Sequence, residues 1–125
     1  MTLAGGDAAP QAGAGSRDAL PVAYANLLWA RALVEGLVAG GVRHVVLSPG
    51  SRSSPLAFAV HGDTRLDVSL QIDERSAAFL ALGIAKATHA PVALVCTSGT
   101  AAANYLPAMA EAWLAGVALV ALTAD

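Results

Sequence analysis

The sequence alternates short apolar runs, each of the length of a β-strand, with longer segments whose apolar residues recur at helical spacing. Strands are predicted over residues 42–47, 66–71, 92–96 and 117–123. Helices are predicted from Val22 to the Gly40-Gly41 stop, from Ser54 toward His61, over 73–88 and over 100–115. Strands and helices alternating at this spacing form right-handed crossovers and a parallel sheet. The predicted fold class is therefore α/β, a parallel sheet with helices on both faces.

Local residue signals mark the ends of the predicted helices. Ser54 is expected to be an N-cap residue with Pro55 at the first helical position, and Asp73 is expected to cap the Ala-rich third helix. Pro107 is expected to kink or restart the last helix, because proline lacks a backbone N–H and clashes with the preceding turn. Gly116 then ends that helix before the final strand.

The apolar composition raises the question of a membrane span. Hydrophobic residues make up 56% of the chain, and the mean hydropathy is +0.60. The longest uncharged region, Ala87–Ala110, is interrupted by His, Pro, Thr, Ser, Gly and Asn residues, so no span is predicted there. Parallel strands covered on both faces explain the hydropathy better. The net charge of −2, with scattered Lys and Arg, also gives no basic surface for nucleic acid.

Length and local composition favour one domain in 125 residues. Residues 1–20 are rich in Ala and Gly and lack the basic start and apolar stretch of a secretory signal, so they are interpreted as a flexible leader. The domain is expected over 21–125, in a cytoplasmic protein. The single cysteine, Cys96, lies in an apolar strand and is expected to be a buried, reduced thiol.

Three polar segments each follow a predicted strand: Ser48–Ser54, Asp73–Arg75 and Thr97–Ala101. Because the carboxyl ends of parallel strands meet at one edge, these segments are expected to form one site. The sequence contains neither G-x-G-x-x-G nor a P-loop, and Ser98 lacks the glycine that precedes a hydrolase nucleophile by two residues. The three histidines are far apart and match no zinc-ligand spacing; they are His44, His61 and His89.

Glu74 is the acidic residue of most interest, because it follows a predicted strand and begins a predicted helix whose next residues are apolar. A carboxyl group partly desolvated there is suited to exchanging a proton with a heterocycle, although the helix dipole alone also favours an acid at this position. Arg52, flanked by Ser51 and Ser53, offers hydrogen-bond donors for a carboxylate. The alternative interpretation is a solvated loop arginine without a ligand. The turn at 97–100 offers backbone N–H groups and a glycine that permits close approach of a ligand. The alternative interpretation is an ordinary helix start.

Together these segments resemble the N-terminal pyrimidine-binding domain of the thiamine-diphosphate enzymes. The resemblance covers about residues 26–125. It is carried by Gly-Val-Arg-His at 41–44, Pro-Gly-Ser-Arg-Ser at 49–53, Asp-Glu-Arg at 73–75, Ala-Leu-Gly at 81–83, Thr-Ser-Gly-Thr-Ala at 97–101 with Asn104, and Leu-Thr-Ala-Asp at 122–125. The Pro-Gly-Ser-Arg-Ser segment is typical of the branch that serves menaquinone biosynthesis.

The resemblance implies a role for each candidate residue. Glu74 would be the catalytic and cofactor-binding glutamate that hydrogen-bonds the aminopyrimidine ring of thiamine diphosphate. Further residues are implied to border that ring: Pro49, Thr97, Gly99 and Asn104. Ser51 and Arg52 would bind a carboxylate of isochorismate. The implied reaction decarboxylates 2-oxoglutarate and adds the succinyl carbanion to isochorismate, with the chemistry supplied by the cofactor.

The resemblance also implies partners beyond these residues. Family members carry a central domain and a diphosphate-binding domain, which holds Mg²⁺, and their cofactor lies between two subunits of a homo-oligomer. The chain is therefore expected to be a partial pyrimidine domain, inactive alone and exposing apolar surface. Two alternatives stay open: another thiamine-diphosphate decarboxylase or carboligase, such as an acetolactate-synthase relative, and a non-catalytic α/β interaction module.

Overall fold

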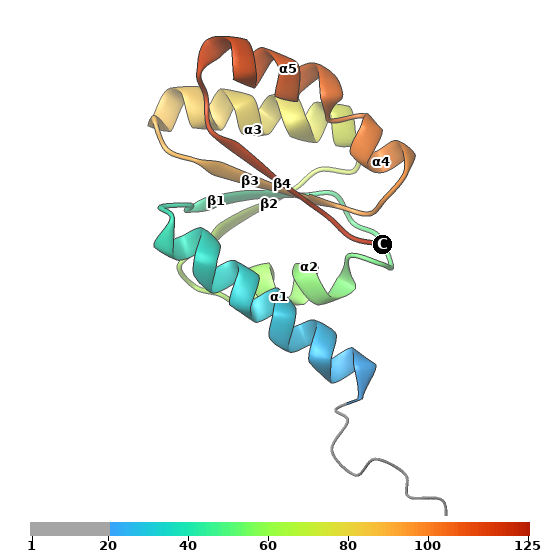
Figure 1. Cartoon of the computed structure of the whole chain (residues 1–125). Coiled ribbons are helices and arrows are strands. Elements are labelled where there is room, and N and C mark those ends of the chain that lie inside the picture. The colour runs from blue at the N-terminus through green and yellow to red at the C-terminus, as the bar shows by residue number, and fades with distance from the viewer. Residues whose placement is uncertain (1–20) are drawn as a thin grey trace, which may run out of the picture.

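A four-stranded parallel sheet forms the centre of the computed structural model, which describes residues 21–125 (Figure 1). The strands are β1 (His44–Leu47), β2 (Asp67–Leu70), β3 (Val92–Cys96) and β4 (Leu119–Thr123), in the spatial order β2-β1-β3-β4. The helices are α1 (Val22–Ala39), α2 (Ser54–His61), α3 (Glu74–Thr88), α4 (Thr100–Ala103) and α5 (Leu106–Ala115). The predicted α/β class is confirmed. The expected leader at 1–20 lies outside the described residues.

Helices cover both faces of the sheet, as Figure 1 shows, and each face has its own apolar core. On one face, α1 and α2 pack on Val45, Leu47, Ala93 and Val95. On the other, α3, α4 and α5 pack on Val46, Val92, Leu94 and Cys96. Since alternate residues of a strand point to opposite faces, the uninterrupted apolar sequence of the central strands serves both cores. Cys96 is buried, as expected.

The helix ends agree with most of the capping signals. Asp73 is the N-cap residue of α3, and its carboxylate accepts a hydrogen bond of 2.8 Å from the backbone N–H of Ser76. Pro107 does restart the last helix, because α4 ends at Ala103 and α5 begins at Leu106. Gly116 ends α5 in the left-handed conformation, with φ of 65°.

The N-cap expected at Ser54 is wrong. Helix α2 begins at Ser54 itself after Ser53, and neither hydroxyl caps it. The Ser54 hydroxyl instead donates to the carbonyl oxygen of Ser51 (2.8 Å), and the Ser53 hydroxyl donates to that of Gly50 (3.0 Å). Both side chains turn back into the preceding loop because this loop has carbonyl groups to satisfy. They therefore stabilise the loop rather than the helix.

Within 21–125, α1 is the one helix whose length and composition make it a candidate membrane span. It carries Arg31 and Glu35 near its middle, and the Glu35 carboxylate lies 2.6 Å from the Arg65 guanidinium. Its Ala30 and Val34 are buried in the core beside the sheet. Through these two residues α1 packs as a covering helix on one face of the sheet.

His89 offers a test of local backbone strain at the end of α3. It adopts φ of 54° and ψ of 29°, and is the one non-glycine residue with positive φ among residues 21–125. The left-handed conformation destabilises the folded state by about 1–2 kcal/mol for a residue with a Cβ. Glycine avoids this strain, but its greater freedom in the unfolded chain lowers the free energy of unfolding by about 0.4–1 kcal/mol. His89→Gly is therefore expected to raise the free energy of unfolding by about 0.5–1 kcal/mol in denaturant titrations. Ala90→Gly, at negative φ, should not stabilise the chain; equal gains in both variants would contradict this explanation.

Candidate active site

The loops after β1, β2 and β3 meet at the carboxyl edge of the sheet. Strand β1 lies between β2 and β3, so the predicted convergence of the three polar segments is a consequence of the strand order. The backbone continues the pairing beyond the strands: the N–H of Ser48 donates to the carbonyl of Val95 (2.8 Å), and that of Gln71 donates to the carbonyl of Leu47 (3.0 Å). The sheet therefore fixes where each of the three loops begins.

The first and third loops are in direct contact through Gly50 and Thr97. A Cβ built on Gly50 would overlap Cγ2 of Thr97, and it would lie 3.5 Å from the Cβ and Oγ1 of the same residue. Only a glycine permits this approach of the backbone to the Thr97 side chain. Sequence reasoning did not single out Gly50; its place between Pro49 and Ser51 in a loop after a strand was the available signal.

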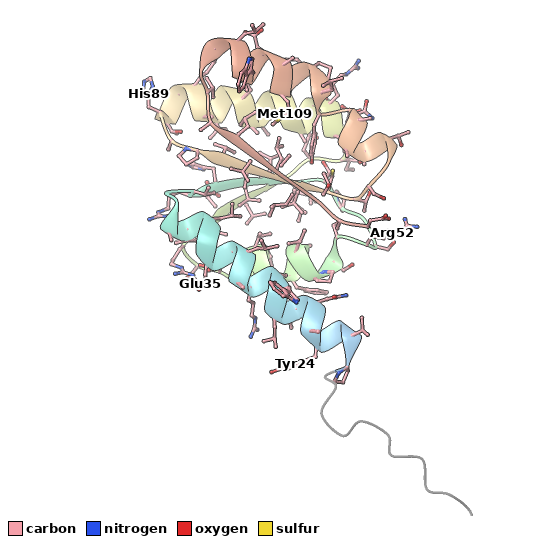
Figure 2. All side chains as sticks on the ribbon, in the orientation of Figure 1. Tyr24, Glu35, Arg52, His89 and Met109 are labelled. Atoms are coloured by element: carbon pink, nitrogen blue, oxygen red, sulfur yellow. The ribbon has the colours of Figure 1, made fainter. Side chains whose placement is uncertain are left out.

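The loop of residues 48–53 is folded so that Ser51 and Arg52 face outward. The Ser53 side chain is buried, whereas Ser51 is exposed and the Arg52 side chain is 64% exposed. Nε of Arg52 lies 3.8 Å from Oδ1 of Asp125, and the Ser98 hydroxyl donates to the same oxygen at 3.2 Å. Figure 2 shows Arg52 at the edge where the described chain ends. The Arg52 guanidinium is thus presented to solvent, with one distant carboxylate as its partner.

Glu74 lies at the first position of α3, where the helix N-terminus favours a negative charge. The residue is half-buried, and its carboxylate forms no hydrogen bond or ion pair with another residue of 21–125. Burial raises the pKa of both the Cys96 thiol and the Tyr105 hydroxyl, and the negative charge of Glu74 adds a smaller contribution to each rise. The carboxylate expected at this position is therefore present, partly desolvated and unpaired.

A layer of three polar side chains lies buried beneath this edge: Ser48, Cys96 and Tyr105. The Cys96 thiol donates to the carbonyl oxygen of Thr97 (3.0 Å), and burial raises the pKa of that thiol. Burial also raises the pKa of Tyr105 far above its usual range; Cys96 adds to the rise, and the Ser48 hydroxyl opposes it. The Ser48 and Tyr105 hydroxyls are neighbours, but no hydrogen bond of good geometry joins them.

The turn after β3 is open around Gly99. Gly99 has φ of 67°, and a Cβ placed there would meet nothing within 4 Å. The amide of Asn104 donates to the carbonyl of Thr100 (2.9 Å), which leaves its carbonyl oxygen available. An unpaired carboxylate, an open glycine turn and a free amide oxygen together fit a planar heterocycle with ring nitrogens and an amino group. The carboxylate and the amide oxygen are acceptors of the kind that the amino group and a protonated ring nitrogen of an aminopyrimidine would meet.

The structure thus brings the sequence candidates to one edge of the sheet. Glu74, Ser51, Arg52, Thr97 and Gly99 lie on the three loops or at their ends, and Pro49 is exposed beside them. Asn104 is one helical turn further on, at the end of α4. Ser48 begins the first predicted polar segment, but its burial was not predicted, and Tyr105 was not singled out. A separate cavity of about 650 Å³ lies between α1 and α2 and shares no residue with this edge.

A protein-family model matches residues 29–125 and is described as the N-terminal TPP binding domain of thiamine pyrophosphate enzymes. The chain belongs to this family. Thiamine pyrophosphate is another name for thiamine diphosphate, so the expected resemblance, the fold and the cofactor are confirmed at the level of the family. The unpaired Glu74 carboxylate and the open turn at Gly99 also fit a domain that binds thiamine pyrophosphate.

Curated relatives narrow the resemblance within the thiamine pyrophosphate family. The chain is similar to proteins named 2-succinyl-5-enolpyruvyl-6-hydroxy-3-cyclohexene-1-carboxylate synthase. One from Geobacillus thermodenitrificans is 64% identical over 94 residues, which are 75% of this chain and 16% of the relative. One from Myxococcus xanthus is 61% identical over 100 residues, 80% of this chain and 17% of the relative. The chain therefore spans less than a fifth of the length of these relatives.

Proposed function

We propose that the protein containing this chain is a thiamine-diphosphate-dependent carboligase of menaquinone biosynthesis. It decarboxylates 2-oxoglutarate and adds the succinyl unit to isochorismate. The observation that carries the proposal is identity of 56–64% to curated synthases of that name over about three quarters of the chain or more. Glu74 and Arg52, which lie at one sheet edge, supply the two kinds of group that such a reaction needs, a carboxyl for the cofactor and a cation for an acidic substrate.

Glu74 is proposed as the catalytic residue. Its half-buried carboxyl group holds a proton at a ring nitrogen of the aminopyrimidine, a task for which an unpaired carboxyl in a partly desolvated position is suited. When bound, thiamine diphosphate supplies a nucleophilic thiazolium carbon. Residues of the first and third loops and of α4 border the ring: Pro49, Thr97, Gly99 and Asn104. The contact between Gly50 and Thr97 keeps the first and third loops at a fixed separation.

Ser51 and Arg52 are proposed to bind a carboxylate of isochorismate. The Arg52 guanidinium has a planar set of donors that matches a carboxylate, and the adjacent hydroxyl of Ser51 adds a donor. Arg52 is exposed, and its one acidic neighbour, Asp125, stands 3.8 Å away, so an incoming carboxylate has access to it. Such a clamp orients the acceptor relative to the nucleophile.

Arg52→Ala tests the substrate assignment in the protein that contains this chain. We expect KM for isochorismate to rise about tenfold, as loss of about 1.4 kcal/mol of carboxylate binding implies, while the Kd of thiamine diphosphate stays unchanged. Carbon dioxide release from 2-oxoglutarate, followed at varied isochorismate, gives this KM. Arg31→Ala, on the exposed side of α1, is the matched control.

An unchanged response to isochorismate in Arg52→Ala would instead favour the first alternative, a relative of acetolactate synthase with a different acceptor. The second alternative, an interaction module without catalysis, predicts that neither Arg52 nor Glu74 affects any turnover. No feature of the sheet edge favours either alternative over the proposed carboligase.

The assembly around the chain is part of the proposal. Mg²⁺ ligands are proposed to lie on a diphosphate-binding domain, and the site is proposed to form between subunits of a homo-oligomer, a dimer or tetramer, in the cytoplasm. Large exposed apolar side chains near the site support a covering surface; they include Leu70, Ile72, Phe79 and Leu106. The domain over 21–125 is accordingly proposed to be an incomplete pyrimidine domain, and the 125 residues alone to be inactive.

A further inference from the structure

The hydroxyls of Ser48 and Tyr105 have no role in the function proposed so far. Ser48 is 1% exposed and Tyr105 2% exposed, and their side-chain oxygens are the two buried polar atoms of residues 21–125 without a hydrogen-bond partner. Buried hydroxyl groups in folded proteins nearly always have a partner, so an orphaned pair at one place calls for an explanation. Their common location beneath the sheet edge suggests that the partner belongs to the site above them.

Tyr105 is held close to the start of α3. It packs in the same core as Ala77 and Ala78, which lie in the helical turn that follows Glu74. Ser48 is held from the other side, because its backbone N–H donates to the carbonyl of Val95 at the end of β3. Ser48 is therefore held where β1 pairs with β3, and Tyr105 is held at the junction of α4 with α5 by its core packing with α3.

Two of the neighbouring polar side chains already have partners. The Asp73 carboxylate accepts from the backbone of Ser76, and the Cys96 thiol donates to the carbonyl of Thr97. Arg75 is exposed on the first turn of α3. The Ser48 hydroxyl, itself unpaired, lies beside that of Tyr105, and the Glu74 carboxylate is the unpaired charged acceptor on this side of the sheet.

We propose that Tyr105 is a positioning residue for Glu74, its hydroxyl donating from the buried side to one carboxylate oxygen while Ser48 steadies that hydroxyl. This proposal rests on the role assigned to Glu74 under the proposed function. A glutamate side chain rotates about three bonds, so one fixed hydrogen bond restricts its carboxylate to a narrow range of directions. The second oxygen is then left to face the aminopyrimidine ring. Tyr105 touches neither substrate nor cofactor in this arrangement.

The contact between Tyr105 and Glu74 is testable without cofactor. The ¹³Cζ chemical shift of a tyrosine reports the hydrogen bond of its hydroxyl, and the chain has two tyrosines, Tyr105 and Tyr24. In ¹³Cζ-tyrosine-labelled apoprotein, Glu74→Gln should shift the Tyr105 signal, because a neutral amide is a weaker acceptor. The signal of Tyr24, which lies on α1 away from the site (Figure 2), should stay in place. An unmoved Tyr105 signal overturns the proposal.

The consequence for the reaction is tested with Tyr105→Phe, which removes the hydroxyl and keeps the ring in the core. We expect hydrogen–deuterium exchange at the thiazolium carbon of bound thiamine diphosphate to slow about tenfold, with little change in the midpoint of unfolding. Tyr24→Phe should exchange at the original rate. Exchange at the original rate in Tyr105→Phe overturns the proposal when Glu74→Gln slows exchange as expected. If Glu74→Gln itself retains exchange, the proposed function fails, and the positioning role fails with it.

Discussion

Replacing Glu74 by Gln is expected to slow hydrogen–deuterium exchange at the thiazolium carbon of bound thiamine diphosphate by about 10²–10⁴-fold, the usual contribution of a positioned acid or base. Glutamine keeps the size and much of the polarity of the side chain, but its amide cannot exchange a proton with the ring nitrogen. Exchange measured by proton NMR after quenching in acid reports this step separately from carboligation. The loss should therefore appear even without 2-oxoglutarate or isochorismate.

Two features of α3 make Glu74→Gln a clean test. Asp73 remains as the N-cap residue with its 2.8 Å bond to Ser76, so the helix keeps its start. Loss of one charge at the helix N-terminus costs about 0.3–1 kcal/mol, too little to unfold the chain. Glu111→Gln is the matched control, because Glu111 lies on α5 with Lys86 as its partner, 3.8 Å away. Normal exchange in Glu74→Gln would leave Glu74 as a helix-start acid and favour the interaction module.

Much of the fold was predictable because local signals and global packing agree. The uninterrupted apolar run of β3 predicts a strand buried on both faces, and all five of its residues are buried. Asp73 predicts the start of α3 because its own side chain caps the helix. Pro107 predicts the break between α4 and α5 because its own backbone geometry interrupts a helix. That three polar loops share one edge followed from the parallel sheet, whereas their side-by-side placement depends on the strand order.

The features that sequence reasoning missed depend on neighbours distant in the chain. Periodicity identifies strands but not their order, so the contact between the loops after β1 and β3 was not foreseen residue by residue. Tyr105 occurs in a helical segment without a polar partner nearby in sequence, and its burial follows from packing against α3. Ser54 was assigned to a helix cap because the sequence does not reveal the loop carbonyl that competes for its hydroxyl.

Gly50→Ala is the second substitution with a large expected effect, because the added methyl group would occupy the space of Cγ2 of Thr97. The φ of Gly50 is not positive, so alanine meets no backbone strain and the effect is steric. Overpacking of this kind typically costs about 1–3 kcal/mol. Separation of the first and third loops by about 1 Å is expected to lower kcat/KM of the carboligation about 10²-fold.

The atom responsible can be identified by a double-mutant cycle. Thr97→Ser removes Cγ2 and keeps the hydroxyl. Gly50→Ala combined with Thr97→Ser should therefore recover most of the stability and activity that Gly50→Ala loses. No such recovery is expected if Gly50→Ala acts through a general defect of the loop or through loss of glycine flexibility. Gly83→Ala is the matched control: a Cβ on Gly83 meets nothing within 4 Å in the interior of α3, so the variant should gain about 0.5–1 kcal/mol of stability. If the double variant is as impaired as Gly50→Ala, the direct contact between the two loops does not set the geometry of the site. Recovery would mean that the separation of the Arg52 loop and the Thr97 turn is set by this one contact, through which the substrate clamp and the border of the ring are held together.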